Sequence, residues 1–404
     1  MEKVKKLNPF KRAYCRIFQV AVKTVQPVLP FKAPKIIDKI ESVPAVLKQN
    51  GKIKPLIVTG KTVRGLKLTL PLEEKLIEEG LNYAVFDGVV ANPTTDSVLN
   101  ALELYKKSGC DCLIAFGGGS PIDCAKGVGA LIAKPKKTLN KLKGVLKVGK
   151  KIPLLIAIPT TAGTGSETTP AAVIVDSKTR HKYAISDFPL IPSYAVLDEE
   201  VTMTLPKPVV AATGMDALTH AIEAFIGKSG TKSARADALE AVKLIFENIE
   251  NSYFDGSREA RKNMLFASFK AGRAFSKAYV GYVHALAHPL GGKYDVPHGL
   301  ANAVILPIVL ESYGKAVYKK LWKIALYCNL ADEDTAFADG AKIVIDRIKS
   351  LNEKFEIPKA LTVKAEDLDE LSRYAEKEAN PLYPVPVLYS RSQLKQLYKK
   401  IGNL

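Results

Sequence analysis

Short apolar runs alternate with amphipathic stretches over residues 37–204. The apolar runs each end in a glycine or proline turn, as buried strands do, and they lie at 54–60, 82–88, 111–119 and 152–159. Between them, residues 70–81 and 94–109 repeat apolar side chains at the spacing of one helix face. This alternation predicts a doubly wound, mostly parallel sheet, which binds its ligands beyond the carboxyl ends of the strands.

The pattern changes twice further along the chain. In residues 171–187, two β-rich runs flank a polar turn at Ser177–Arg180, which predicts an antiparallel hairpin. From residue 205 onward the helical period dominates. We therefore predict an α/β domain over residues 35–204 and an all-α domain over residues 205–404.

The first 34 residues fit neither domain. Apolar residues recur at helical spacing from Pro9 to Val25 with basic residues between them, which predicts a basic amphipathic helix. Three prolines in residues 27–34 then predict a stiff, extended linker. A helix that packs on its own protein or on another subunit is the favoured interpretation, and docking on an anionic surface such as a membrane is the alternative.

Composition and charge narrow the class of protein. The chain has 404 residues, of which 47% are hydrophobic and 25% charged, as in ordinary globular proteins. Its net charge of +18 is concentrated in residues 1–36, with nine Lys/Arg against Glu2, and in residues 131–151, with eight lysines and no acid. Neither stretch matches a nucleic-acid-binding motif, so we interpret both as solvated surface and expect no specific nucleic-acid partner.

The cysteines and the apolar runs bear on the cellular compartment. The five cysteines are an odd number without a CxxC pair, and the N-terminus has no signal-peptide pattern. The longest apolar runs fall short of the roughly 20 residues that span a bilayer. We therefore expect a protein of the reducing cytoplasm.

Two small-residue turns stand at the ends of predicted strands. Residues 117–119 are three glycines before a predicted helix, and such a turn brings backbone N–H groups and the helix dipole to an anion such as a diphosphate. Ser120 and Asp123 could instead form a helix capping box, which would not explain the glycines. Residues 158–167 form a second such loop, and two loops side by side would hold an extended cofactor.

Four of the five histidines, with one aspartate, fall into two clusters in the predicted helical domain. Asp216 and His220 are spaced i, i+4 on one helix face, a spacing at which both can chelate a divalent metal. His284 and His288 have the same spacing, and Pro289 with Gly291–Gly292 predicts the end of their helix. Spacing favours His284 and His288 as the second chelating pair and leaves His298 uncertain.

With these motifs, the chain resembles the iron-containing (group III) alcohol dehydrogenase family over about residues 35 to 404. The motifs follow one another in the family's order and spacing: "DGVVANPT" (87–94), "GGGSPIDCAKG" (117–127), "AIPTTAGTGSE" (157–167), "GMDALTHAIEAF" (214–225) and "HALAHPLGGKYDVPHGLANAVILP" (284–307). The resemblance implies an NAD(P)-binding α/β domain over residues 35–204 and a helical metal-binding domain over residues 205–404.

The resemblance also implies a role for particular residues. The metal ligands become Asp216, His220, His284 and His298, whereas His288 lies near the nicotinamide and relays a proton; this differs from the pairing that spacing favours. The implied cofactor-binding residues are Asn92, Gly118, Gly119, Ser120, Asp123, Thr160, Thr161 and Lys182. Fe2+ and Zn2+ both suit three imidazoles and one carboxylate.

The implied activity is the interconversion of an alcohol and an aldehyde or ketone by hydride transfer, with the metal polarising the substrate oxygen. A glycerol or polyol (phosphate) dehydrogenase and a dehydroquinate-synthase-like lyase share the fold, but the motif that contains His284 and His288 favours the alcohol dehydrogenase branch. The expected partner is a small alcohol or aldehyde, in a homo-oligomer of two or more copies. A protein that only docks on anionic surfaces through its N-terminal helix is the alternative from another class.

Two features depart from the family pattern. Many NAD-using members carry an aspartate after the strand at 54–60, where this chain has Gly60 and Lys61. Without that carboxylate a 2′-phosphate meets no repulsion, so we expect a preference for NADP(H). Residues 1–34 are the second departure, because the family core does not account for them.

Overall fold

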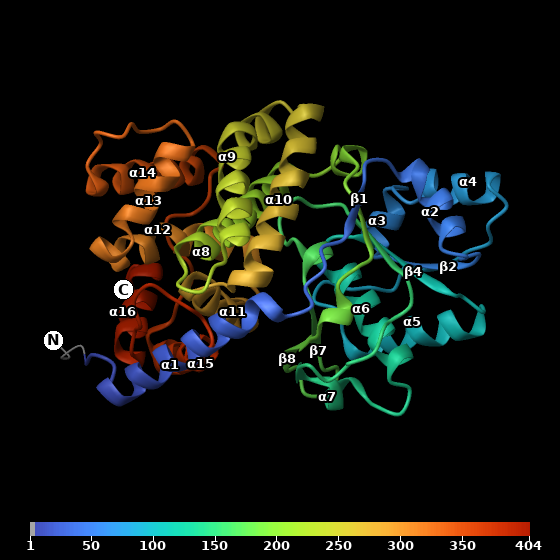
Figure 1. Cartoon of the computed structure of the whole chain (residues 1–404), viewed down its shortest axis with the longest axis horizontal. Helices are drawn as coiled ribbons and strands as arrows, with labels where there is room; N and C mark the ends of the chain where they lie inside the picture. Colours follow the sequence, from blue (N-terminus) through green and yellow to red (C-terminus); the bar gives the residue numbers. More distant parts are fainter. Residues whose placement is uncertain (1–4) are drawn as a thin grey trace. The chain divides into compact units, whose positions relative to one another are not determined.

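The computed structural model describes residues 5–404, and these form two compact units (Figure 1). The α/β unit is Pro30–Leu205. The helical unit is Pro206–Leu404 together with the segment that ends at Leu29. The N-terminal segment, which the sequence sets apart from both domains, therefore belongs to the helical unit.

A six-stranded parallel sheet forms the centre of the α/β unit. Its order is β1-β9-β6-β4-β2-β3, and every neighbouring pair is parallel. The strands in this order are Lys35–Ile37, Tyr194–Val196, Leu155–Pro159, Cys112–Gly117, Pro55–Val58 and Ala84–Phe86. The predicted doubly wound parallel sheet is confirmed.

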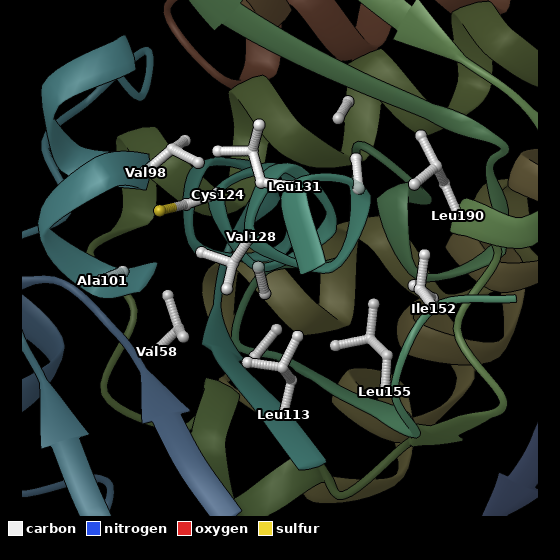
Figure 2. Packing of buried hydrophobic residues seen from close by; sticks show 14 of the residues in the cluster. Val58, Val98, Ala101, Leu113, Cys124, Val128, Leu131, Ile152, Leu155 and Leu190 are labelled. Atoms are coloured by element: carbon white, nitrogen blue, oxygen red, sulfur yellow. The ribbon is translucent and has the colours of Figure 1, made fainter. Parts of the chain in front are cut away.

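Buried residues that alternate along the strands cover both faces of this sheet. Leu113 and Ala115 of β4 point to one face, and Ile114 points to the other. Helices α5 (Thr95–Lys107) and α6 (Gly119–Ala133) cover the first face, and Figure 2 shows their residues packed on β2 and β4. Helices α2 (Val43–Gln49) and α4 (Leu70–Glu78) cover the second face. A sheet with two buried faces explains why its strands are continuously apolar.

The strand order places a topological switch between β2 and β4. The chain leaves β2 for β3 on one side and leaves β4 for β6 on the other. In such sheets the crevice beyond the carboxyl ends at the switch binds the ligand. The turn after β2 at Thr59–Gly60 and the glycine turn after β4 both lie at this edge.

A small second sheet lies beside α6. Strands β7 (Ala171–Val175) and β8 (Lys182–Ser186) form an antiparallel hairpin, and β5 (Gly144–Val145) pairs with β8. Ile174 and Ile185 of this hairpin join the apolar cluster under α6. The predicted hairpin with its turn at Ser177–Arg180 is confirmed.

The helical unit is built around α8 (Lys207–Ile226), which packs on α9, α10 and α12. Among the described residues, α8 is the one unbroken helix that is long and apolar enough to span a membrane, but it is mostly buried as a core helix of its unit. The other helices of the unit are α9 (Lys232–Phe254), α10 (Arg258–Ala278), α11 (Tyr282–Tyr294), α12 (His298–Tyr313), α13 (Tyr318–Tyr327), α14 (Phe337–Lys354), α15 (Leu368–Ala379) and α16 (Arg391–Ile401).

Helix α11 corrects one sequence prediction. Pro289 and Gly291–Gly292 do not end the helix, which continues to Tyr294 and terminates where Asp295 adopts a left-handed conformation with φ 53°. Proline and glycine weaken an isolated helix, but packing of α11 against α12 and α15 outweighs that local penalty. The added turn brings α11 close to the start of α12.

Helix α1 (Pro9–Val25) coincides with the predicted N-terminal helix, and Figure 1 shows it beside α15 in the helical unit. Gln26–Val28 form a 3₁₀ turn, and residues 29–34 then run without helix or strand to β1. The expected linker is therefore shorter than the sequence suggests, because its first proline is part of this turn.

Candidate metal centre and cofactor loops

Four side chains of the helical unit converge on one point. Asp216, His220, His284 and His298 each offer one ligand atom, and these atoms all lie within 4.8 Å of one another. Asp216 and His220 project from successive turns of α8, His284 comes from α11, and His298 is the first residue of α12. The residues that the family resemblance implies as ligands are thus brought together by three helices.

The cluster is buried on one side and open on the other. Asp216, His220 and His284 are buried, whereas the side chain of His298 is 38% exposed. Asp216 Oδ1 lies 3.5 Å from His298 Nε2 and 3.9 Å from His284 Nε2. Donors of a tetrahedral ion with bonds near 2.1 Å are about 3.4 Å apart, so the set needs little contraction to surround one divalent ion.

Electrostatics favour the unprotonated form of His284. Burial, together with His220, His298 and His288 nearby, holds the pKa of His284 well below its usual value. The His284 ring is therefore neutral and offers a nitrogen lone pair near neutral pH. Three imidazoles beside the Asp216 carboxylate form a donor set suited to a divalent cation.

A buried glutamate orients His284. The Nδ1–H of His284 donates to Glu223 Oε2 at 2.7 Å, which directs Nε2 toward the other donors. The same carboxylate accepts the backbone N–H groups of Gly281 and Val283, each at 2.8 Å. Burial raises the pKa of Glu223 to about 7, and these two backbone donors act against the rise.

An asparagine amide lies among the donors. Asn302 Nδ2 donates to Asp216 Oδ1 at 2.7 Å and lies 3.2 Å from Nε2 of both His284 and His298. Within the described part of the chain, the buried Asn302 Oδ1 has no hydrogen-bond partner. The amide therefore turns its N–H group toward the donors and leaves its oxygen unsatisfied.

Close contact between α12 and α8 sets the position of His298. A Cβ on Gly299 would lie 2.2 Å from the backbone oxygen of Ala212 and 3.3 Å from Cβ of Asp216. Only glycine allows the first turn of α12 to approach α8 this closely. The position of His298 beside Asp216 thus depends on the residue that follows it.

His288 lies next to the cluster but outside it. Its ring stacks on the ring of His298 with centroids 5.2 Å apart, and its side chain is 40% exposed. Because the group of four converging donors contains His298 and not His288, the structure differs from the chelating pair that spacing favours. Because α12 begins at His298, this residue lies closer to His284 and Asp216 than its position in the sequence suggests, and it takes the place that spacing gave to His288.

A carboxylate from α15 holds His288. The Nδ1–H of His288 donates to Glu378 Oε1 at 2.6 Å, and the Tyr383 hydroxyl donates to the same oxygen at 2.8 Å. Burial alone would raise the pKa of Glu378, but the contacts with His288 and Tyr383 outweigh it and hold this pKa below the usual value. Glu378 is therefore ionised and orients the imidazole, so that proton exchange is directed to Nε2.

The predicted diphosphate loop lies at the switch edge of the α/β unit. Gly117 has φ 149°, and a Cβ there would lie 2.6 Å from Cγ of Pro121, so this turn requires glycine. The N-cap of α6 is Gly118 and has no side-chain cap, which overturns the Ser120/Asp123 capping box as an explanation. The backbone instead turns sharply into α6 and leaves its first N–H groups to a ligand.

The second loop lies against the first. Thr160 is buried, and its N–H donates to the Gly117 oxygen at 3.2 Å. A Cβ on Gly118 would lie 3.3 Å from Oγ1 of Thr161, so the two loops are in contact. Side chains at this edge are therefore small where an extended ligand would pass.

Asn92, Ser120 and Lys182 form one polar chain beside the glycine turn. The Asn92 N–H donates to Ser120 Oγ at 3.2 Å, and Lys182 Nζ donates to Asn92 Oδ1 at 2.7 Å. Asn92 adopts a left-handed conformation with φ 55°. These three predicted cofactor residues come from three segments, the loop after β3, the start of α6 and strand β8.

Asp123 and Lys126 tie α6 to the second loop. Asp123 accepts from Ser166 Oγ at 2.7 Å and from the Val173 N–H at 3.0 Å, so both its oxygens are engaged by the protein. The fully buried Lys126 donates to the backbone oxygens of Ser166 at 2.6 Å, Thr169 at 2.9 Å and Ala171 at 2.8 Å. In this structure Asp123 positions the loop that carries Thr160 and Thr161.

Three residues of the site escaped the sequence analysis. Glu223 lies seven residues after Asp216 and Asn302 lies four after His298, so helical spacing from the ligands could have found both. Glu378 reaches His288 from 90 residues away. No local pattern could have indicated that contact.

Comparison with known proteins gives a consistent result for both units. The iron-containing alcohol dehydrogenase family matches residues 36–199, and the C-terminal part of the Fe-containing alcohol dehydrogenase family matches residues 210–402. The 1,3-propanediol dehydrogenase of Citrobacter freundii is 39% identical over 336 residues, which cover 81% of this chain and 86% of that protein.

Solved structures agree with this result. The crystal structure of 1,3-propanediol oxidoreductase has a TM-score of 0.88 at 33% identity, covering 92% of this chain and 99% of that chain. The sulfoacetaldehyde reductase of Bifidobacterium kashiwanohense, in complex with NAD+, has a TM-score of 0.82 at 26% identity, covering 93% and 98%.

Proposed function

Because this chain belongs to the iron-containing alcohol dehydrogenase family and is an alcohol dehydrogenase, we propose that Asp216, His220, His284 and His298 hold one divalent metal ion. The observation that carries the proposal is the convergence of these four donors within 4.8 Å. The neutral state of His284 and its hydrogen bond to Glu223 both suit metal binding through Nε2. Fe2+ and Zn2+ are both suited to this set of nitrogen and oxygen donors.

The chain's own residues then have distinct tasks in hydride transfer. When bound, the divalent ion supplies a Lewis acid for the substrate oxygen and the nicotinamide supplies the hydride acceptor. His298 and His288 stand on the exposed side of the cluster, where a small alcohol would approach. His288, oriented by Glu378, takes the alcohol proton at Nε2 and passes it to solvent.

We also propose that the two loops at the switch edge bind NAD(P). The N–H groups of Gly119 and Ser120 at the start of α6 would receive the diphosphate, with Thr160 and Thr161 opposite and Asn92 and Lys182 alongside. The turn after β2 carries Gly60 and the exposed Lys61, so no carboxylate stands there to repel a 2′-phosphate. This favours NADP(H) over NAD(H).

The substrate we propose is a small, unphosphorylated alcohol or the corresponding aldehyde. The relatives named for 1,3-propanediol act on such a compound, and they align with more than four fifths of this chain.

The compartment we propose is the cytoplasm. All five cysteines are free thiols, which agrees with a reducing compartment. We keep a homo-oligomer as the expected assembly.

The test is a kinetic assay with controlled metal content. Protein that has been stripped by a chelator and reloaded with Fe2+ or Zn2+ is assayed against a panel of small alcohols and aldehydes with both nicotinamide cofactors. We expect turnover to depend on reloading and kcat/KM for aldehyde reduction to be higher with NADPH than with NADH. Full turnover by the stripped protein would contradict the metal proposal, and a clear preference for NADH would contradict only the cofactor preference.

A further inference from the structure

Helix α1 packs on the helical unit through a face on which Cys15 and Gln19 are buried and Arg16 is half-buried. The guanidinium of Arg16 donates to the backbone oxygens of Val385 at 2.8 Å and Pro386 at 3.0 Å. The amide of the buried Gln19 donates to the backbone oxygens of Pro381 at 3.1 Å and Tyr383 at 2.7 Å. Polar hydrogen bonds to backbone oxygens therefore account for much of this contact, and most of the large apolar side chains of α1 lie outside it.

The opposite face of α1 is apolar and exposed. The exposed fraction is 87% for Phe10, 58% for Tyr14, 70% for Ile17, 63% for Val20 and 51% for Val25. Phe10, Tyr14, Ile17 and Val20 share one face because they recur every three or four positions. Val25, at the end of the helix, and Val28, at 80%, extend the patch. A contiguous apolar patch on a surface helix indicates a site where another apolar surface binds.

Basic side chains surround this apolar face. Residues 5–36 hold eight Lys/Arg and no acid. Near the C-terminal end of α1, burial and the positive charges of Arg235, Lys228, Lys23 and Lys323 together lower the pKa of Lys320 to about 8. That repulsion shows that several cations lie together beside the helix.

A basic hollow adjoins the N-terminal end of α1. Its volume is about 580 Å³, and it is lined by five cationic side chains, Lys5 and Lys6 among them, against two acidic ones, Asp369 and Glu376. Glu376 already pairs with Lys11 at 2.9 Å. The hollow therefore keeps an excess of positive charge that a phosphate group of a lipid head could neutralise.

The charges decide between the possible occupants of the apolar face. A second copy docked through the same face would bring two basic surroundings together, and like charges would oppose that contact. A bilayer with anionic lipids meets both requirements, because it takes apolar side chains at the acyl boundary and basic ones among the head groups. We infer that α1 docks this protein on the surface of an anionic bilayer.

The bonds of Arg16 and Gln19 make this contact compatible with the folded protein. They hold α1 on the helical unit, so the exposed apolar face can enter the lipid boundary without any rearrangement. None of the residues of this surface belongs to the metal cluster. Docking therefore places the intact enzyme at a membrane surface and leaves alcohol oxidation unchanged.

Sedimentation of the full-length protein with vesicles tests the inference. We expect the protein to pellet with phosphatidylcholine–phosphatidylglycerol vesicles at moderate salt, to remain in solution with phosphatidylcholine alone, and to be released by high salt.

The variant Ile17→Glu should weaken binding to the anionic vesicles by about tenfold or more. It removes a large apolar side chain from the face that enters the lipid and adds a negative charge.

Matched variants show whether the loss of binding is specific to the surface formed by α1 or follows from any added negative charge. Ile77→Glu changes a side chain on α4 that is 64% exposed, and it should bind vesicles like the wild type. Lys23→Glu should weaken binding, whereas Lys359→Glu, at an exposed lysine elsewhere in the helical unit, should not. Alcohol oxidation in solution should be the same for all four variants, which also shows that they are folded.

Three results would overturn the inference. The first is a wild-type protein that does not pellet with the anionic vesicles at moderate salt. The second is equal binding by the wild type and Ile17→Glu. The third is a drop in molar mass by light scattering for Ile17→Glu without vesicle binding by the wild type, which would show that a second copy covers this face.

Discussion

At the scale of single residues, the proposed metal donors depend on a neighbour that is not itself one of the four. Asn302 donates to Asp216 Oδ1 and fixes the rotation of that carboxylate. We expect Asn302→Leu to weaken metal affinity by about 10- to 100-fold, as the loss of a partner hydrogen-bonded to a ligand generally does. Chelator competition measures this affinity.

A half-buried amide of the same unit provides the control for Asn302. Asn352 donates to the backbone oxygen of Ala303 on α12 and, among the described hydrogen bonds, makes none to the four donors. Asn352→Leu should destabilise the fold without a change in metal affinity. Equal metal affinity in wild type and Asn302→Leu would show that Asp216 is oriented by the helices alone.

The orientation of His288 gives a kinetic prediction. Glu378→Gln keeps the size of the side chain but removes the charge that holds the imidazole at 2.6 Å. We expect kcat to fall by about 100-fold, the contribution typical of a positioned proton acceptor, with KM and metal content little changed. Steady-state kinetics with metal analysis checks this, and an unchanged kcat would remove Glu378 and His288 from the proton path.

The buried Glu167 predicts a pH dependence of stability. Burial raises its pKa from 4.5 to about 7, so between these pH values the folded protein keeps a proton that the unfolded chain has lost. Its contribution to stability is therefore fully present below pH 4.5 and is lost as pH rises through 7.

The variant Glu167→Gln should isolate this effect, because its side chain stays neutral. The free energy of unfolding of Glu167→Gln relative to wild type should rise between pH 4.5 and 7.5 by up to about 3 kcal/mol. Denaturant titrations across this range measure the difference. Glu333→Gln, at an exposed position, serves as the control, and a difference independent of pH would contradict the assignment.

At the scale of elements, one lysine joins helix α6 to the second cofactor loop. Lys126→Met would remove one donor from each of three backbone oxygens. We expect a loss of about 3 kcal/mol in the free energy of unfolding, together with weaker cofactor binding, because the loop with Thr160 and Thr161 is no longer held. Denaturant titration and cofactor fluorescence measure the two effects.

Lys107→Met on α5 is the matched control in the same unit, since Lys107 is exposed. It should leave both the free energy of unfolding and the cofactor affinity near the wild-type values. If Lys126→Met weakened only stability and bound the cofactor normally, the loop would not depend on Lys126 for its position.

Local pattern predicted most elements, and it failed where tertiary contacts decide the outcome. The strands, the hairpin and α1 follow directly from apolar periodicity. Helix α11 passes Pro289 and two glycines because its neighbours stabilise it. The capping box at Ser120 and Asp123 does not form, since Asp123 is engaged by Ser166 and Val173 of distant segments.

At the scale of the whole molecule, the sequence predicted the α/β sheet and the helical unit. Apolar periodicity over a long stretch indicates which face of a strand or helix is buried without knowledge of its neighbours. Spacing within a helix found Asp216 with His220, whereas the place of His298 depends on how α12 approaches α8 through Gly299. The direction in which α1 faces was likewise out of reach, since the choice between its two faces depends on backbone oxygens more than 360 residues away.

The most direct test of this account is the metal content of three purified variants after loading with Fe2+ or Zn2+ and dialysis. Asp216→Ala and His298→Ala should retain less than a tenth of the metal held by the wild type, because each removes one of four converging donors. His288→Ala should keep the full metal content and lose mainly turnover. Loss of metal from His288→Ala, or full retention by His298→Ala, would contradict the central claim.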